Sequence, residues 1–291
     1  MHSALELRKR RPDGNAGNTA LAEVPSSLPL LSRAQTSRIR ALSRDKQART
    51  AEGTFIIEGA RAVRDLLTRH PTSVRELVLT PAYVERESHQ DRRLREALSV
   101  PSYLCGEQAF ARLSDVEAPQ GLLAVAAQPT WQEDRVFSQP TVLGVFGESI
   151  RDPLNLGAII RTSAALDVSA LWLSSDSADP YNPKVVRASA ATVLTVPIFT
   201  GVDVASLMEK GCEVYAAVAH GGRGVVGIRE VPSIPGRLIL AFGNEGQGLS
   251  EETLQRASRR FTIPLSPRVE SLNVAATVAI AVYHFERLAR Q

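Results

Sequence analysis

Residues 238–282 of the chain read LILAFGNEGQGLSEETLQRASRRFTIPLSPRVESLNVAATVAIAV. The apolar run Leu238–Phe242 leads directly into the glycine-rich segment Gly243–Gly248, a pattern typical of a buried strand that ends in a tight loop. A second short apolar run, Phe261–Leu265, precedes Ser271–Asn273 and a long segment with the apolar periodicity of a helix. Ligands bind at strand ends in open α/β sheets, so we expect a binding site where these segments meet.

The glycines of this loop could instead cradle a phosphate, as they do in dinucleotide sites and P-loops. The spacing fits neither pattern, because no Gly-Lys-Ser/Thr follows and the loop lies late in the chain. This placement disfavours a nucleotide-dependent oxidoreductase. A glycine loop is most often a simple turn, although glycine also lets the main chain approach a ligand closely. Glu245 is either a polar partner within the site or a loop acid before the next helix.

An upstream segment, Asp152–Thr162, reads DPLNLGAIIRT and is predicted to begin a helix. Asn155 is a good candidate for the helix N-cap, since its side-chain oxygen can accept a hydrogen bond from an unpaired backbone N–H group. Arg161 falls beside the apolar face of this helix, where an arginine must be paired or exposed. Taken alone, Arg161 is best explained by an ordinary ion pair.

Taken together and in this order, the segment 152–162, the glycine loop and the segment 261–273 resemble the three signature motifs of the SpoU (TrmH-like) RNA ribose 2′-O-methyltransferases, within the SPOUT superfamily. The resemblance implies an α/β fold in which a small α/β RNA-binding domain precedes a SPOUT domain with a parallel sheet and a deep trefoil knot. It further implies S-adenosyl-L-methionine as cofactor, no metal, and a homodimer with the active site near the subunit interface.

The resemblance also implies roles for individual residues. Arg161 corresponds to the catalytic arginine of the family, and Asn273 to an asparagine that helps to position it. Ile263 and Leu272 would flank the adenine ring, whereas without the resemblance they would be assigned to the core. The expected catalytic residues are Asn155, Arg161, Glu245, Ser271 and Asn273. The expected cofactor-binding residues are Phe242, Gly243, Gly248, Ile263, Leu272 and Asn273. Ser271 is also expected to behave like an N-cap before the last helix.

The chemistry explains why an arginine would serve this reaction. A ribose hydroxyl is a poor nucleophile at neutral pH, and alignment with the methyl donor can supply up to ~7–11 kcal/mol of the barrier in ideal cases. The pKa of arginine lies above ~12, so a simple base role is chemically awkward. We therefore expect Arg161 to orient and polarise the 2′-hydroxyl and an adjacent phosphate, with proton loss assisted by that phosphate or by a neutralised guanidinium.

The composition of the chain limits the number of domains and the classes of protein to which it can belong. The 291 residues, 44% hydrophobic and 22% charged, fit one large or two moderate soluble domains. The net charge of +3 is weak evidence for nucleic-acid binding, because the placement of arginine residues indicates such binding better than the total charge does. Cys105 and Cys212 lack the spacing of a disulfide framework or a zinc site. No apolar run approaches the ~20 residues of a spanning helix, and no signal peptide is recognised, so we predict a cytoplasmic protein without membrane contact.

Changes in apolar periodicity along the chain predict that it has four parts. Residues 1–31 have no periodicity and are expected to be a disordered basic tail that carries Arg8–Arg11. Alternating strands and helices over residues 32–128 predict a compact α/β unit, which more weakly resembles the substrate-RNA-binding domain of the family. Residues 129–140 are the expected linker, and residues 141–291 the expected methyltransferase domain. The expected RNA-binding residues are Arg33, Arg38, Arg40, Lys184 and Arg187.

The C-terminal half contains nearly continuous apolar strands between helices, which indicates a largely parallel sheet covered on both faces. Nothing in the spacing indicates a knot, so that expectation rests on the resemblance alone. The strands are expected at residues 142–146, 170–173, 195–199, 213–219, 238–242 and 262–263.

The function favoured by this reading is 2′-O-methylation of structured RNA, with ribosomal RNA preferred over transfer RNA because of the additional N-terminal domain. A transfer-RNA 2′-O-methyltransferase is the first alternative. A catalytically silent RNA-binding or assembly protein of the same fold is the second, and the presence of all five expected catalytic residues argues against it.

Overall fold

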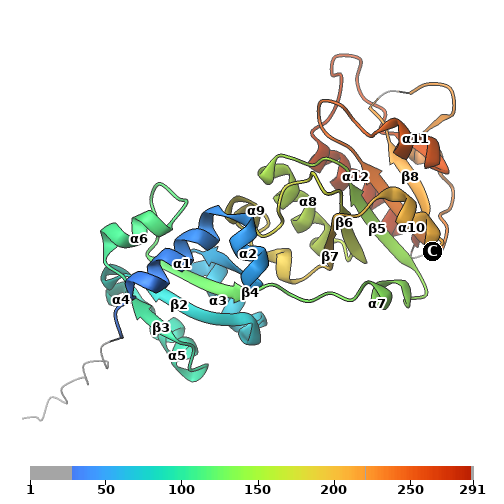
Figure 1. Ribbon diagram of the computed structural model, residues 1–291. Helices are drawn as coiled ribbons and strands as arrows, with labels where there is room; N and C mark the ends of the chain where they lie inside the picture. The colour runs from blue at the N-terminus through green and yellow to red at the C-terminus, as the bar shows by residue number, and fades with distance from the viewer. Residues whose placement is uncertain (1–27, 220, 290–291) are drawn as a thin grey trace, which may run out of the picture.

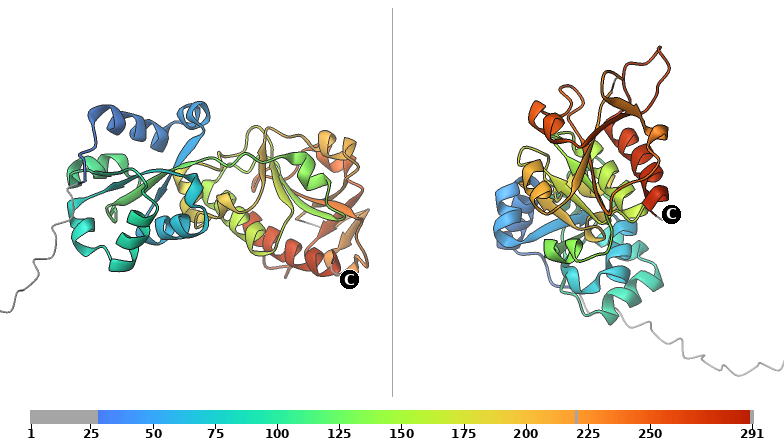
Figure 2. Two further views of the ribbon diagram at one scale, coloured as in Figure 1. Left: turned by 90° about the horizontal axis from the view of Figure 1, so that it is seen from below. Right: turned by 90° about the vertical axis from the view of Figure 1, so that its right-hand side faces the viewer.

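The computed structural model describes residues 28–219 and 221–289, and two β-sheets divide this part of the chain into two units (Figure 1). Four strands within residues 54–127 form the N-terminal sheet, and seven strands within residues 142–262 form the C-terminal sheet. Figure 2 shows the two units side by side, joined by the segment that follows the last N-terminal strand. The expected two-unit α/β organisation is therefore observed.

The N-terminal sheet is mixed and has the order β1-β4-β2-β3. Its strands are β1 (Thr54–Glu58), β2 (Val74–Leu79), β3 (Ser102–Leu104) and β4 (Leu122–Ala127). The central strand β4 pairs antiparallel with β1 and with β2, whereas β3 pairs parallel with β2. Its helices are α1 (Arg33–Arg44), α2 (Lys46–Glu52), α3 (Ala60–Arg69), α4 (Pro81–Arg86), α5 (His89–Ala97) and α6 (Glu107–Leu113).

Apolar residues cover both faces of this sheet. Successive side chains of a strand point to opposite faces, and β1 is apolar on both. Phe55 and Ile57 share a core with the buried side of α3, whereas Ile56 shares a second core with α1 and α6. Asp45 separates α1 from α2, because it ends the first helix and its side chain caps the second.

One expectation for the N-terminal part is wrong at its boundary. Residues 28–31, which the sequence places in a disordered tail, run beside β3 instead. The Leu31 N–H donates to the Leu104 carbonyl at 2.8 Å, and the Leu104 N–H donates to the Pro29 carbonyl at 2.8 Å. These backbone bonds pair an otherwise open sheet edge. The rest of the expected tail, including Arg8–Arg11, lies outside the described residues.

The C-terminal sheet has the order β7-β6-β5-β10-β8-β11-β9, and every strand pair in it is parallel. The expectation of a largely parallel sheet is confirmed. Its strands are β5 (Val142–Gly147), β6 (Ala170–Leu173), β7 (Ile198–Thr200), β8 (Glu213–Ala217), β9 (Val225–Gly227), β10 (Arg237–Phe242) and β11 (Arg259–Thr262). Its helices are α7 (Glu133–Phe137), α8 (Pro153–Ala165), α9 (Pro183–Ala188), α10 (Val204–Glu209), α11 (Glu251–Arg256) and α12 (Val274–Ala289).

Helices cover both faces of this sheet, as its continuous apolar strands require. On one face, Val145 and Leu240 share a core with buried residues of α8 and α12. On the other face, Phe146 and Ile239 share a core with α7 and α10. The helix α7 lies within the expected linker and is fixed there by Glu133, which accepts a hydrogen bond from Trp172 Nε1 at 2.6 Å.

Three strands differ from the expected boundaries. In the segment 195–199, where a strand is expected, strand pairing begins only at Ile198, because Pro197 has no N–H group to donate to a neighbouring strand. The strand β9 was not expected, since its three residues lie in a glycine-rich stretch without an apolar run. The strand β11 begins at Arg259, three residues before the expected start. Within the described residues, no helix combines the length and apolarity needed to cross a bilayer.

A buried ion pair connects the two units. Arg49 of α2 donates to Asp179 through Nε at 2.8 Å and contacts the same oxygen through Nη2 at 2.6 Å. Only 3% of the Arg49 side chain and 10% of the Asp179 side chain are exposed. Arg49 Nη1 also donates to the Leu42 carbonyl at 2.8 Å, so the guanidinium is well satisfied. Helix α9 packs against β1 beside this pair.

We expect the Arg49→Ala variant to lose about 3–5 kcal/mol of unfolding free energy, because removing one partner leaves the buried Asp179 carboxylate unpaired. Urea denaturation followed by circular dichroism measures this loss. The matched control is Arg64→Ala, which breaks an ion pair whose arginine side chain is 48% exposed and should cost less than about 1 kcal/mol. Equal losses for the two variants would contradict a stabilising role for the buried pair.

Candidate functional site

A cavity of about 420 Å³ lies beyond the carboxyl ends of β8, β10 and β11. Three segments line it: the chain that leaves β8, the glycine loop that leaves β10, and the chain between β11 and α12. Parallel strands place their carboxyl ends at one edge of a sheet, so segments that are distant in sequence meet there. Residues expected in this region that do line the cavity are Phe242, Gly243, Glu245, Gly248, Ile263, Ser271 and Leu272.

The glycine loop closes on itself through its backbone. The Asn244 N–H donates to the Gly248 carbonyl at 3.1 Å, and the Gly248 N–H donates to the Asn244 carbonyl at 2.8 Å. Gly248 has a φ of +72°, in the left-handed region that favours glycine. A Cβ on Gly243 would lie 2.1 Å from the Gly248 carbonyl carbon, so only glycine fits at that position.

Asn244 ties the glycine loop to the rest of the site. Its side-chain oxygen accepts a hydrogen bond from the Gly246 N–H at 2.8 Å, and its side-chain nitrogen donates to the Ser149 carbonyl at 3.0 Å. The loop after β10 is thereby fixed to the loop after the neighbouring strand β5. The sequence analysis did not select Asn244, although an asparagine directly before a glycine-rich turn is a signal for side chain-to-backbone bonding.

A chain of side-chain hydrogen bonds joins three of the expected catalytic residues. Asn273 Nδ2 donates to Asn155 Oδ1 at 2.8 Å, and Asn155 Nδ2 donates to a carboxylate oxygen of Glu245. These residues come from the start of α12, the start of α8 and the glycine loop. The three segments selected from the sequence therefore meet at one place.

The structure corrects two expectations about helix caps. Asp152, not Asn155, caps α8: its carboxylate accepts from the Leu154 N–H at 2.9 Å, and Pro153 occupies the first turn. Asn155 lies inside that turn, which leaves its amide free to bridge. At α12, Asn273 accepts from the Ala275 N–H at 2.8 Å and takes the capping position expected of Ser271.

Arg161 lies further along α8 and does not line the cavity. Six residues separate it from Asn155, which is about 9 Å along a helix axis. Its side chain is exposed, and it makes no ion pair or hydrogen bond with any part of the chain that the structure describes. The ion pair that the isolated sequence suggests is therefore not observed, and the guanidinium is available to a ligand.

The expected RNA-binding residues divide into two groups. Arg33, Arg40 and Lys184 are exposed and make no ion pair with the described residues. Arg187 contacts Asp115 at 3.0 Å. The guanidinium of the fifth residue, Arg38, forms ion pairs within the N-terminal unit.

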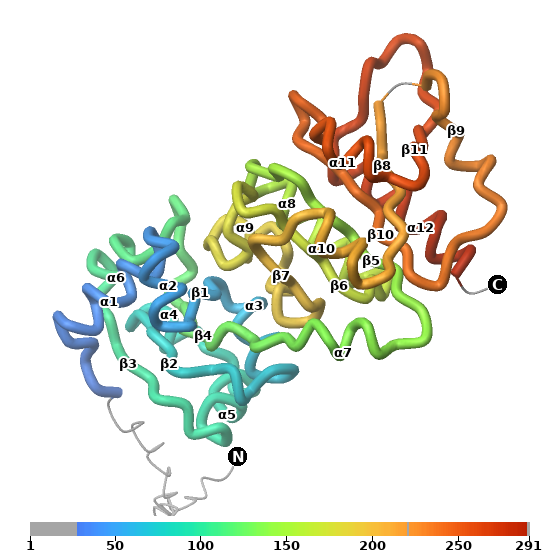
Figure 3. The backbone as a smooth tube through the Cα atoms, turned by 45° about the vertical axis from the view of Figure 1, so that its right-hand side comes forward, coloured from blue at the N-terminus to red at the C-terminus, as the bar shows by residue number. Residues whose placement is uncertain are grey.

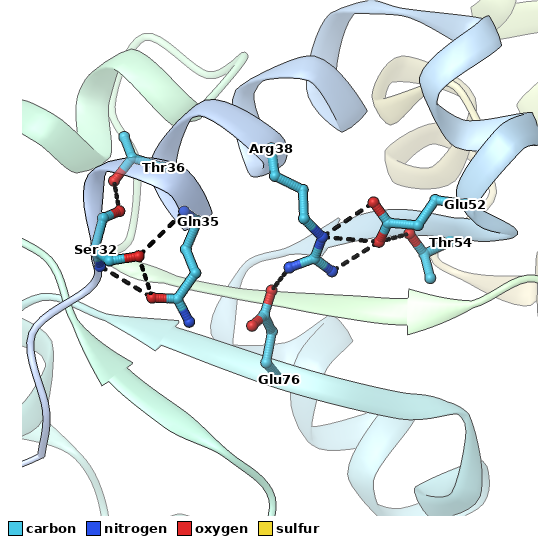
Figure 4. Close-up of polar contacts among 7 residues, drawn as sticks. All are labelled: Ser32, Gln35, Thr36, Arg38, Glu52, Thr54 and Glu76. Carbon is cyan, nitrogen blue, oxygen red and sulfur yellow. Dashed lines mark hydrogen bonds and ion pairs between the residues drawn. The ribbon is translucent and has the colours of Figure 1, made fainter.

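Arg38 lies between two carboxylates (Figure 4). Its Nη2 contacts Glu52 at 2.7 Å and its Nη1 contacts Glu76 at 2.7 Å, while Nε also donates to Glu52. The hydrogen bond from Arg38 lowers the pKa of Glu52, and the same pairing raises the pKa of Arg38. Arg38 therefore connects α1 to the sheet, and the expectation of an available phosphate contact at this position is corrected.

The site has no group of metal-binding side chains in the described part of the chain. No three His, Cys, Asp or Glu residues there are placed so that they could hold a metal ion together. The polar groups around the cavity are amides, hydroxyls, the two carboxylates of Glu245 and Glu270, and exposed backbone. This set can bind an organic ligand by main-chain contacts beside the apolar side chains of Ile263 and Leu272, whereas the Phe242 side chain is buried in the core.

Two family models match the chain. The model of the SpoU rRNA Methylase family matches residues 143–283, and that of the MRM3-like substrate binding domain matches residues 35–124. The 23S rRNA (guanosine(2553)-2'-O)-methyltransferase RlmP of Bacillus subtilis is 31% identical over 244 residues, which span 82% of this chain and 91% of that protein. The uncharacterized tRNA/rRNA methyltransferase slr1673 of Synechocystis is 32% identical over 257 residues, which span 86% of this chain and 89% of that protein.

A solved structure shows the same arrangement of both units. The SpoU methyltransferase AviRb from Streptomyces viridochromogenes, in complex with its cofactor AdoMet, superposes with a TM-score of 0.77 at 25% identity. The match covers 88% of this chain and 98% of that one. The similarity therefore includes the N-terminal unit as well as the parallel sheet.

We expect Gly243→Ala to destabilise the protein by about 1–3 kcal/mol, because the added methyl group would overlap the backbone at Gly248 and Leu249. The matched control is Gly246→Ala in the same loop, where the added carbon would meet only the Asn244 side-chain oxygen at 3.4 Å. Thermal unfolding of both variants measures the difference. A Gly243→Ala variant as stable as Gly246→Ala would show that the loop is not closed in this way.

Proposed function

Because the chain belongs to the SpoU rRNA methylase family, we propose that it transfers a methyl group from S-adenosylmethionine to a ribose 2′-hydroxyl of ribosomal RNA. One structural observation supports the proposal in addition to family membership. The hydrogen bonds that join Asn273, Asn155 and Glu245 bring the three signature segments together beside a cavity of suitable size. A protein that had lost the activity would have no need to keep this polar connection at the cavity mouth.

The cavity fits the cofactor in two respects. Ile263 and Leu272 offer apolar contact to an adenine ring, and the backbone of the glycine loop is open to close approach by a ligand. Phe242 also lines the cavity, although its side chain packs in the core. Gly248 and Asn273 complete the proposed cofactor-binding set. When bound, S-adenosylmethionine supplies an activated methyl group, so the residues of the chain must bring the ribose oxygen into line with it and exclude competing water.

Arg161 is the proposed catalytic residue. Its exposed guanidinium has no internal partner, so its five N–H donors are available to a 2′-hydroxyl and an adjacent phosphate. In this role Arg161 orients and polarises the hydroxyl, and the phosphate assists loss of the proton. Asn155, Glu245, Ser271 and Asn273 are the proposed supporting residues, with the first two holding the glycine loop against α8.

The proposed enzyme is a homodimer. Leu154 of α8 and Ile280 and Tyr283 of α12 are large apolar side chains that are 62%, 42% and 66% exposed. Exposed apolar residues on neighbouring elements mark interaction surfaces, and α8 packs against α12. This surface begins next to Asn155, so a second subunit bound here would lie close to the cavity. Such a subunit can bring its own Arg161 towards the cavity of its partner.

The parts of the chain have distinct proposed roles. Residues 32–128 bind substrate RNA, residues 129–140 form the linker that contains α7, and residues 141–291 carry catalysis within the proposed trefoil knot. The family match over residues 35–124 supports the first assignment. Exposed Arg33, Arg40 and Lys184 are the proposed phosphate contacts, and the cytoplasm is the proposed location.

We expect Arg161→Ala to lower methylation of ribosomal RNA by about 100-fold or more, because removing a donor aimed at the reacting oxygen typically costs 10²–10³ in rate. Transfer of labelled methyl groups to purified 23S ribosomal RNA measures the rate, with transfer RNA as the alternative substrate. Isothermal titration with S-adenosylmethionine should give an unchanged Kd. Near-normal turnover of the variant would refute the role of Arg161, and preferential methylation of transfer RNA would favour the alternative substrate.

We expect Tyr283→Asp to convert the protein to a monomer, because a charge in the apolar surface must lose its hydration when the subunits associate. Light scattering coupled to size-exclusion chromatography measures the mass of the particle. The matched control is Gln255→Asp on exposed α11, which should leave the mass unchanged. A wild-type protein that elutes as a monomer would exclude the proposed homodimer.

A further inference from the structure

A second cavity, of about 410 Å³, lies between the two units and shares no lining residue with the cavity at the glycine loop. The N-terminal unit contributes the end of β1, the start of α3 and the loop over residues 116–120, and the C-terminal unit contributes α9. Figure 3 shows α9 beside β1 and α3. The volume lies within the range of about 300–1,000 Å³ that is typical of small-molecule sites.

The walls of this cavity are apolar and come from both units. Ala62, Val116 and Ala118 line it from the N-terminal unit, and Pro183 and Val186 line it from α9. Branched and cyclic side chains of this kind form flat surfaces that suit an aromatic ring. The rotation of one unit against the other is limited by the buried Arg49–Asp179 pair, so the two walls are held at a fixed separation.

Polar groups at the edge of the cavity have unused bonding capacity. Arg187 Nη2 donates to Asp115 at 3.0 Å, but Arg187 Nη1 is buried and makes no hydrogen bond with the described residues. A buried donor without a partner costs about 1–3 kcal/mol. Gln120 Oε1 accepts from the Ala60 N–H at 2.9 Å, whereas no bond of its side-chain nitrogen is found within the described chain.

The charges at this edge are mixed. Arg61 and Arg187 are positive, while Glu58 and Asp65 supply carboxyl groups. Glu58 accepts a hydrogen bond from Ser114 Oγ at 2.6 Å, and burial raises the pKa of its carboxyl group. Balanced charge disfavours a bare anion. It favours a flat heterocycle whose edge carries both donors and acceptors.

We propose that the cavity between α3 and α9 holds one unstacked base of the RNA substrate, with Arg187, Glu58 and Gln120 at its hydrogen-bonding edge. This inference rests on the proposed function for the presence of RNA. Sequence-specific recognition of RNA depends mainly on bases that are splayed out of the stack and bound by their edges and faces. The cavity lies at the junction of the two units, so an RNA that contacts both units can reach it.

The test uses the full-length protein with saturating S-adenosylhomocysteine, so that adenosine cannot enter the cofactor cavity. The probes are the four ribonucleoside 5′-monophosphates, with ribose 5-phosphate as the control without a base, and saturation-transfer NMR measures their binding. We expect at least one nucleotide to bind about tenfold more tightly than ribose 5-phosphate, and Arg187→Gln to weaken that binding by about tenfold.

A pair of loop variants locates the binding. Ala118 is exposed and lines the cavity, so Ala118→Trp should fill it without disturbing the core and should weaken nucleotide binding by more than about tenfold. Glu117→Trp is the matched control, since Glu117 is exposed on the same loop but does not line the cavity. Equal binding of ribose 5-phosphate, or equal effects of the two tryptophan variants, would overturn the proposal.

The same variants separate this proposal from the proposed function. With ribosomal RNA as substrate, Ala118→Trp should raise KM for RNA about tenfold while the Kd of S-adenosylmethionine stays unchanged. If wild type methylates ribosomal RNA and Ala118→Trp has an unaltered KM, the base site is refuted and the proposed function stands. If wild type binds nucleotides in this cavity but methylates no RNA, the proposed function fails and the cavity assignment does not.

Discussion

The side-chain amide of Asn155 carries an NH2 donor group and an oxygen acceptor, and each is bonded to a different signature segment of the chain. Its nitrogen donates to Glu245 in the glycine loop, and its oxygen accepts from Asn273 at the start of α12. Of the side chains of this size, only an amide can donate and accept in this fixed geometry. A carboxylate at position 155 would face Glu245 with like charge, and an apolar residue would leave two polar partners unsatisfied. The arrangement of the candidate site depends on this single bridging group.

The bridge is possible because other residues meet the local requirements of the backbone. Asp152 caps α8, and Pro153 starts it with a φ already suited to the helix. The parallel pairing of β5 with β10 brings the loops after these two strands to the same edge of the sheet. Asn244 then connects the two loops through the Ser149 carbonyl. Polar residues at the cavity mouth are in this way held by a rigid sheet, and their positions do not rely on mobile loops.

The arginines of this protein serve two different physical purposes. Arg38, Arg49 and Arg95 are paired with carboxylates within the fold, and Arg49 joins the two units. Arg33, Arg40 and Arg161 are exposed and remain available to ligands. The net charge of +3 does not reveal this division, because the carboxylates that contact the first group of arginines neutralise most of their positive charge. The proposed recognition of RNA depends on where unpaired guanidinium groups lie and on the cavity between the units, more than on total charge.

The sequence by itself determined the class of fold, six of the seven strands of the C-terminal sheet and the three segments that form the site. The spacing of apolar residues and the positions of glycine are local properties of the sequence, so they can be recognised without coordinates. Tertiary structure decided which of two good capping residues, Asp152 or Asn155, caps α8. It also decided that Arg38 is paired while Arg161 is free, because Glu52 and Glu76 approach Arg38 only when the sheet has formed. Tertiary structure also forms the cavity between α3 and α9, since the residues of its walls lie more than sixty positions apart in the sequence and only the packed fold brings them together.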